Sequence, residues 1–330
     1  MRWPTDVSQP KVGASDAELA TQVRHGRCDS FRLLYRRHYP AVHGYASTCS
    51  RTPLDAFELT SQAFTQLLHR MVSGDVTTDR LTGCIRLQLL DLVRTIGVQR
   101  CVRDPGGFAP QFRQWVGNGA NWSLDEGGQL AHAWQRIPHE ARCLLWHTLV
   151  ERDAPLAVSR FAGTSTDEID RARVGALAAV RSGRAALYLS QISLSDDCRR
   201  AVQELMAHPD DPASLHHCYS CPDCFNVYQD VIHADTRLES QLPLALLGWW
   251  PVLDYLNLRA AIPVPLTDPP FLERAVRQAE RAVGRPRTEH GRWRRVLMPN
   301  GPALAGTVFL TGLAVGALVG WVLITQSAGI

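Results

Sequence analysis

The chain has 330 residues and a mass of 36.6 kDa, more than one small hydrophobic core needs, which predicts two or three domains. Its 45% hydrophobic and 20% charged residues exclude a wholly disordered chain, and its 24 glycines and 20 prolines show neither a collagen period nor low complexity. The net charge of +3 excludes a uniformly basic, histone-like protein, so any DNA binding has to depend on local basic patches.

The first residues, 1–14, are expected to form a flexible N-terminus. They lack the apolar stretch of a secretory signal, so we expect the bulk of the protein to face a reducing cytosol. The nine cysteines of the chain should then be free thiols or metal ligands rather than disulfides.

Residues 15–103 are predicted to form a first helical domain. Their apolar residues recur at helical spacing and almost nowhere alternate with polar ones, and the same holds up to residue 300. Ser15 and Glu18 form a capping-box pattern at the start of the first helix, and Thr52 with Pro53 predicts the start of another. The part of the chain before residue 300 should therefore be all-α.

A linker and a second helical domain are predicted next. Residues 104–128 are rich in Gly, Pro and Asn and show no sustained period, which is typical of a linker. Residues 129–190 contain a short helix, a turn at Gly163, and a long helix that opens with a capping box between Ser165 and Glu168. This pattern predicts a helix-turn-helix, although helix pairs joined at a glycine also occur in many α proteins that never contact DNA.

A small helical module with metal-ligand spacing is predicted at residues 191–235. His217 precedes Cys221 by one helical turn, and Cys221 and Cys224 form a Cys-x2-Cys pair. Thiolate and imidazole ligands at this spacing favour a tetrahedral zinc ion over hard cations. A set of buried or reactive thiols is the alternative, since a structural disulfide is not expected in a reducing compartment.

The remaining cysteines show no paired spacing and fall inside or beside apolar helical faces, so we expect them to pack in the core. They are Cys28, Cys49, Cys84, Cys101 and Cys143.

Residues 236–301 are predicted to be a juxtamembrane spacer. Within it, residues 271–283 form an amphipathic, arginine-bearing pattern. Such a helix can lie on an anionic membrane surface or serve as a plain helical spacer, and the sequence leaves both open.

Residues 302–325 are predicted to form a single transmembrane helix, because 24 residues without a charge can span the hydrocarbon layer of a bilayer. Arginines precede this span and residues 326–330 carry no charge, so the positive-inside rule places the N-terminal part in the cytoplasm and the short tail outside. Gly312, Gly316 and Gly320 share one face and would allow close approach of a second copy in the membrane.

Three segments, in this order, resemble the extracytoplasmic-function sigma factors, which are bacterial RNA polymerase subunits that select promoters. Residues 15–47 resemble the opening of the promoter-melting domain of this family, residues 55–68 its polymerase-clamp helix, and residues 137–182 its second, promoter-recognising domain. The resemblance implies polymerase-binding residues on the clamp helix, namely Asp55, Glu58 and Gln62. It implies DNA-binding residues on the helix-turn-helix, namely Ser165, Thr166, Arg171 and Arg173.

The module at residues 191–235 is similar to the zinc-binding anti-sigma domain. That resemblance implies a fourth metal ligand on the preceding helix, the place that Cys198 fills. The intervening stretch is shorter than the family usually has, which leaves three rival ligands open, namely His208, His216 and Cys218.

The predicted function is therefore a membrane-tethered, sigma-like regulator of transcription initiation. We expect it to bind core RNA polymerase and promoter DNA under the control of its own zinc module. The sequence shows no nucleophile with a paired base, so we do not expect an enzyme. Phe57 and Gln62 stand where the family tends to place Glu, and Asp167, Glu168 and Asp170 would repel phosphates. A degenerate sigma fold that acts as a membrane-bound interaction scaffold, or as a thiol or zinc redox sensor, is thus the alternative.

Overall fold

The computed structural model describes residues 13–73, 84–120, 124–209 and 211–283, and in this part of the chain the prediction of an all-α protein is confirmed. No β-strand occurs in the described ranges, where the one isolated bridge joins Ser50 to Phe108. The predicted membrane span at 302–325, its three glycines and the tail at 326–330 lie outside the described residues. None of the helices that the structure describes is both long and apolar enough to cross a membrane.

The first block consists of four helices that share one core: α1 (Asp16–Arg24), α2 (Ser30–Cys49), α3 (Pro53–Ser73) and α4 (Ile85–Arg103). The predicted capping box of α1 is confirmed, since Ser15 Oγ accepts from the Glu18 amide and Glu18 accepts from the Ser15 amide. Phe31, Tyr35 and Phe64 interlock edge to face between α2 and α3. Full burial of each such side chain stabilises the block by roughly 1.5–3 kcal/mol.

The segment 104–128 contains helices, in contrast to the predicted linker. They are the 3-10 turn η1 (Pro105–Gly107), α5 (Pro110–Gly117) and the first turn of α6 (Leu124–Arg136). The amide of Ala109 donates to the carbonyl of Cys49, and Phe112 is buried against Trp249 with ring centroids 5.4 Å apart. The few apolar residues of this segment find partners distant in sequence, so local periodicity alone did not predict the helices.

The second block contains α6, α7 (His139–Leu145), the π-helical turn η2 (Trp146–Val150), α8 (Pro155–Ala162) and α9 (Thr166–Leu189). The predicted turn at Gly163 and the capping box that follows it are confirmed, since α8 ends at Gly163 in the left-handed region (φ 74°) and Ser165 opens α9 with a capping box. Trp134 and Trp146 are fully buried in this block.

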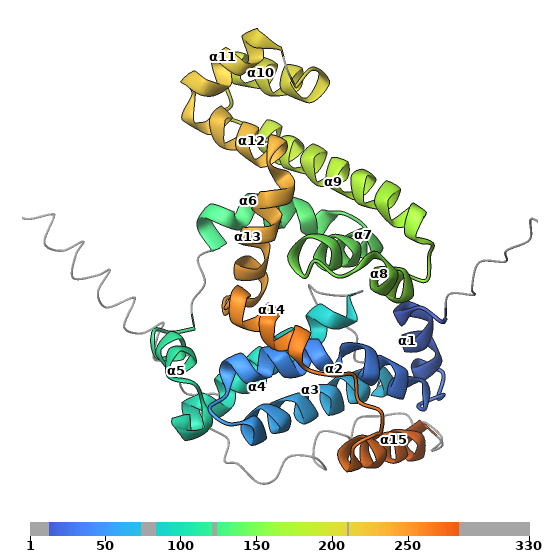
Figure 1. The fold of residues 1–330 in the computed structure, drawn as a ribbon. Helices are drawn as coiled ribbons and strands as arrows, with labels where there is room; N and C mark the ends of the chain where they lie inside the picture. Colours follow the sequence, from blue (N-terminus) through green and yellow to red (C-terminus); the bar gives the residue numbers. More distant parts are fainter. Residues whose placement is uncertain (1–12, 74–83, 121–123, 210, 284–330) are drawn as a thin grey trace, which may run out of the picture. The chain divides into compact units, whose positions relative to one another are not determined.

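Three short helices follow α9: α10 (Asp196–Ala207), α11 (Pro212–Ser220) and α12 (Pro222–Ile232). They contact one another, and α10 and α12 also contact α9 (Figure 1). A small separate core lies between them and α9, in which Tyr188, Val202 and Val227 are buried. A hydrogen-bonded ion pair between Arg184 and Asp230, 2.6 Å long and almost fully buried, joins α9 to α12.

The chain after this module returns to the first two blocks, whereas the sequence predicted a spacer. The segment forms α13 (Ala234–Leu247), α14 (Val252–Ala261) and α15 (Pro270–Val283). Helix α13 packs on α6, α14 on α2, and α15 on α3 (Figure 1). The amphipathic pattern predicted for α15 is confirmed, but its apolar face is buried in the protein and is therefore not available to a membrane surface.

Candidate metal centre

Local signals place each side chain of the candidate centre at a helix end. Ser195 caps α10, which puts Cys198 in its first turn. Asp211 caps α11, and His217 lies in the last turn of that helix. Cys221 is both the C-cap of α11 and the N-cap of α12, where Pro222 occupies the first helical position and so separates the two helices sharply.

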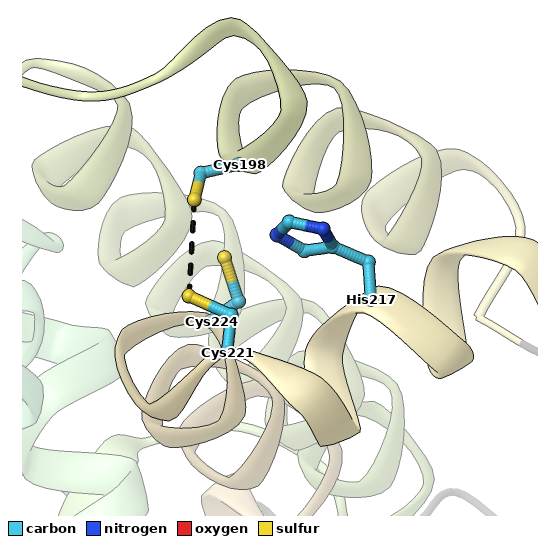
Figure 2. Close-up of side chains that lie close together, drawn as sticks. All are labelled: Cys198, His217, Cys221 and Cys224. Atoms are coloured by element: carbon cyan, nitrogen blue, oxygen red, sulfur yellow. Dashed lines mark hydrogen bonds between the residues drawn. The ribbon is translucent and has the colours of Figure 1, made fainter.

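The candidate metal centre consists of Cys198, His217, Cys221 and Cys224, whose ligand atoms all lie within 4.8 Å of one another. Sγ of Cys198 and Sγ of Cys221 are 3.8 Å apart, and all four side chains point toward a common point between α10, α11 and α12 (Figure 2). Cys224 is buried, whereas the other three are half-buried. Four sulfur and nitrogen ligands at these separations could hold one metal ion.

The hydrogen bonding around the metal centre fits a bound cation. Nε2 of His217 is buried and has no hydrogen-bond partner among the described residues, which is the state expected of a nitrogen reserved for a metal. Hydrogen bonding from Ser195 lowers the pKa of Cys198 to about 7, against the opposing effect of burial, so this thiol ionises readily. Burial raises the pKa of Cys224 to about 12, so this thiol needs the cation to deprotonate at neutral pH.

A tyrosine of α9 completes the surroundings of the metal centre. The hydroxyl of Tyr188 lies 3.3 Å from Sγ of Cys224. Tyr188 itself is buried, so its hydroxyl has to find its partner inside the protein. The sequence did not single out this residue, because its proximity arises from the packing of α12 on α9 and not from any spacing along the chain.

The ligand set that the structure brings together is the one predicted. Among the described residues, the rival ligands His208, His216 and Cys218 do not belong to the metal centre. Cys218 is instead fully buried in the small core of α10–α12.

The predicted polymerase-binding residues lie on α3, but two of them have partners inside the chain. Asp55 accepts hydrogen bonds from the amide and hydroxyl of Thr52, which caps the helix. Glu58 accepts from Arg100 of α4 at 2.9 Å, whereas Gln62 is exposed. Asp55 is thus engaged in the helix cap, and Arg100 partly neutralises the charge of Glu58.

The predicted DNA-binding residues lie at the start of α9. Thr166 and Arg171 are exposed and Arg173 is half-exposed. Ser165 is occupied as the helix cap, since its hydroxyl pairs with Glu168. Thr164 and Ser165 also lower the pKa of Glu168 to about 2, so this exposed carboxylate stays charged at the end where phosphates would approach.

A second cluster of thiol and imidazole groups was not predicted. Cys84, Cys143 and His147 bring their ligand atoms within 4.8 Å of one another. The two cysteines also pack in the hydrophobic core, as predicted. The four-residue spacing between Cys143 and His147 places them on one helical face and was a usable signal. Cys84 lies far away in sequence, so its convergence on the pair could not be read from spacing.

No protein-family model, curated protein or solved structure matches this chain.

Proposed function

We propose that the protein is a membrane-tethered, sigma-like regulator of transcription initiation whose C-terminal helices restrain its polymerase-binding surface. The proposal rests on the sequence resemblance of residues 15–182 and on one structural observation. That observation is the packing of α15 along α3, the helix that resembles the polymerase-clamp helix of sigma factors (Figure 1). A polymerase that binds this side of α3 would have to displace α15.

The contact between α15 and the first block is apolar at its centre. Phe271 packs edge to face on both Phe57 of α3 and Tyr35 of α2, with ring centroids 5.8 Å apart in each pair. Leu272 and Val276 are fully buried on the same face of α15. Phe57 stands where the family tends to place a glutamate, and its ring supports a hydrophobic contact within the chain in place of a charged contact with polymerase.

Ion pairs orient α15 on the first block. Arg32 of α2 donates to Asp268 and Glu273, each at 2.5 Å, and Arg36 donates to Asp268 at 3.0 Å. Asp268 is nearly buried, so its two arginine partners hold the pKa of its carboxyl below the ordinary value despite burial. Such partly shielded ion pairs favour one register of α15. Substitutions that remove or reverse their charges should therefore release α15 from the first block.

The metal centre is proposed to hold zinc and to support the same restrained state. It closes α10–α12 into a folded unit at the end of α9, and α13–α15 follow directly from that unit. Loss of the ion would loosen the start of the segment that covers the first block. The predicted membrane span would then keep the restrained protein at the cytoplasmic face of the membrane until a signal or a protease releases it.

Charge reversal on the α15 side tests the restraint in the full chain. Asp268→Arg with Glu273→Arg places repulsive charges against Arg32 and Arg36, so binding to bacterial core RNA polymerase in a co-elution assay should rise at least about tenfold, corresponding to about 1.4 kcal/mol. Adding Arg32→Glu and Arg36→Glu restores opposite charges and should lower binding again. Glu280→Arg, at an exposed position of α15, is the matched control and should leave binding unchanged.

Run-off transcription from promoter fragments distinguishes polymerase binding alone from polymerase binding with promoter recognition. Transcripts from the charge-reversed variant would support a sigma-like role with promoter recognition. If the reversed variant binds polymerase no better than the Glu280→Arg control, the proposed restraint is wrong.

The second candidate function is a membrane-bound interaction scaffold without promoter recognition. It is favoured by the partners that Asp55 and Glu58 have within the chain, Thr52 and Arg100 respectively. The charged Glu168 at the start of α9 also favours it. Under this alternative, promoter DNA binding should be weak and should show no steep dependence on salt. A filter-binding assay at two salt concentrations, with and without polymerase, distinguishes the two candidates.

A further inference from the structure

Outside the metal centre, three soft ligands converge at the junction of the two helical blocks. Sγ of Cys84 lies 3.9 Å from Nε2 of His147, and Sγ of Cys143 lies within 4.8 Å of Sγ of Cys84 and of an imidazole nitrogen of His147. Cys84 and His147 are almost fully buried, whereas Cys143 is half-buried. A sulfur and a nitrogen on one tetrahedral zinc ion lie about 3.5 Å apart, given bonds of about 2.3 and 2.0 Å, so the separation is close to that of a coordinated pair.

Two blocks contribute to this cluster, and one of them has unusual local geometry. Cys84 is the N-cap of α4 in the first block. Cys143 lies on α7, and His147 lies in the π-helical turn η2 that continues it. Such π-turns are rare and occur frequently at functional sites, because the extra residue per turn re-aims a side chain. His147 is the second residue of this π-turn, and its imidazole lies close to both cysteines.

A carboxylate fixes the orientation of the imidazole. Nδ1 of His147 donates to Oδ2 of Asp153 at 2.8 Å, which leaves Nε2 as the nitrogen that faces Cys84. Histidines that bind metals commonly donate their other ring nitrogen to a carboxylate, which sets the tautomer and strengthens the ligand. Asp153 itself forms an ion pair with Arg259 of α14 at 3.1 Å, which fixes the position of its carboxylate.

We propose that Cys84, Cys143 and His147 form a second transition-metal site of the zinc class that joins the first block to the second. Asp153 is its positioning residue. A fourth ligand, such as a water molecule, would complete the tetrahedral coordination. Two thiolates would neutralise the dication, and the nearby arginines Arg86 and Arg259 already have Glu151 and Asp153 as partners. The inference is independent of the proposed sigma-like function, because it concerns only metal binding.

Metal content of the purified full-length protein tests the site. We expect two zinc equivalents per chain by mass spectrometry of the metal. Cys143→Ala, at a half-buried position, should remove one equivalent, and Cys221→Ser should remove the other. Cys101→Ser is the matched control, because this buried cysteine lies in neither cluster and its replacement should leave two equivalents.

The Cys221→Ser chain isolates the second site for spectroscopy. With cobalt(II) in place of zinc, it should show a sulfur-to-cobalt charge-transfer band that disappears when Cys143→Ala is added. Asp153→Asn should keep the band but weaken cobalt affinity about 10- to 100-fold, which a loss of folding would not reproduce. Circular dichroism of each variant confirms that the helices are retained.

Two results would overturn the proposal. One is a Cys221→Ser chain that binds no metal, or one whose bound metal is unaffected by Cys143→Ala. The other is a Cys84–Cys143 disulfide, identified as a linked peptide pair when the protein, purified without oxidant, is cleaved and its peptides are analysed by mass spectrometry.

Discussion

At the scale of single residues, Tyr188 links the predicted DNA-recognising helix to the metal centre. Its hydroxyl lies 3.3 Å from Sγ of Cys224 and can donate to the thiolate of a metal-bound cysteine. Tyr188→Phe removes that donor and preserves the ring in the small core. We expect the affinity for zinc to fall about 10-fold or more, measured by competition with a chromophoric chelator.

Tyr219→Phe is the control for this prediction. Tyr219 lies in the same module, but it is exposed and its hydroxyl donates to Tyr228. Its replacement should leave zinc affinity unchanged. Equal affinities of the two variants would contradict a role of Tyr188 at the metal centre.

Three ligands of the candidate metal centre could be predicted from their spacing, whereas Cys198 came from the resemblance to the anti-sigma domain and the surroundings could not be predicted. His217, Cys221 and Cys224 are close in sequence, so their spacing on adjoining helix ends already brings them together. Tyr188 and the Cys84 cluster depend on helix packing between segments that no local pattern relates. Chemical type and spacing therefore predict a site only where the chain supplies its ligands within one or two turns.

At the scale of the helical elements, the turn between α8 and α9 depends on a glycine. Gly163 has a φ of 74°, and a Cβ added there would lie 2.7 Å from Cβ of Ser15, the N-cap of α1. Gly163→Ala therefore imposes both backbone strain and a clash between the two blocks. We expect the free energy of unfolding to fall by about 1–3 kcal/mol in urea denaturation of the full chain.

Gly175→Ala is the matched control on the same helix. Gly175 is exposed within α9, and an added Cβ would meet nothing within 4 Å. Alanine should stabilise the protein there by up to about 1 kcal/mol, because glycine is unfavourable inside a helix. The prediction fails if the two substitutions change stability in the same direction.

Helices with strong local signals were predicted from the sequence, and those without them were not. The capping boxes at Ser15 and Ser165 and the turn at Gly163 are local, and the structure confirms them. Helix α5 was missed because proline and glycine surround it and its buried Phe112 packs on Trp249, far away in sequence. The covering role of α13–α15 was missed for the same reason, since amphipathicity predicts a buried face but not what buries it.

At the scale of the described molecule, a buried carboxylate ties three distant segments together. Glu151, directly after η2, accepts from Arg86 of α4, from the Tyr255 hydroxyl at 2.5 Å and from Arg259 at 3.0 Å, the last two on α14. Burial alone would raise the pKa of Glu151, but Arg86, His147 and Arg259 hold it well below its ordinary value. The carboxylate is therefore charged and joins the first block, the second block and the C-terminal helices.

Removal of this charge should destabilise all three segments together. Glu151→Gln leaves Arg86 buried without its counter-charge, so we expect a loss of about 3–5 kcal/mol in the free energy of unfolding. Glu239→Gln is the control, because Glu239 pairs with Arg152 at the exposed surface and should contribute less than about 1 kcal/mol. Urea denaturation followed by tryptophan fluorescence measures both.

Because α14 directly precedes α15, the Glu151→Gln chain should also bind core polymerase more tightly at low urea. A destabilised variant with unchanged polymerase binding would show that α15 does not restrain the first block.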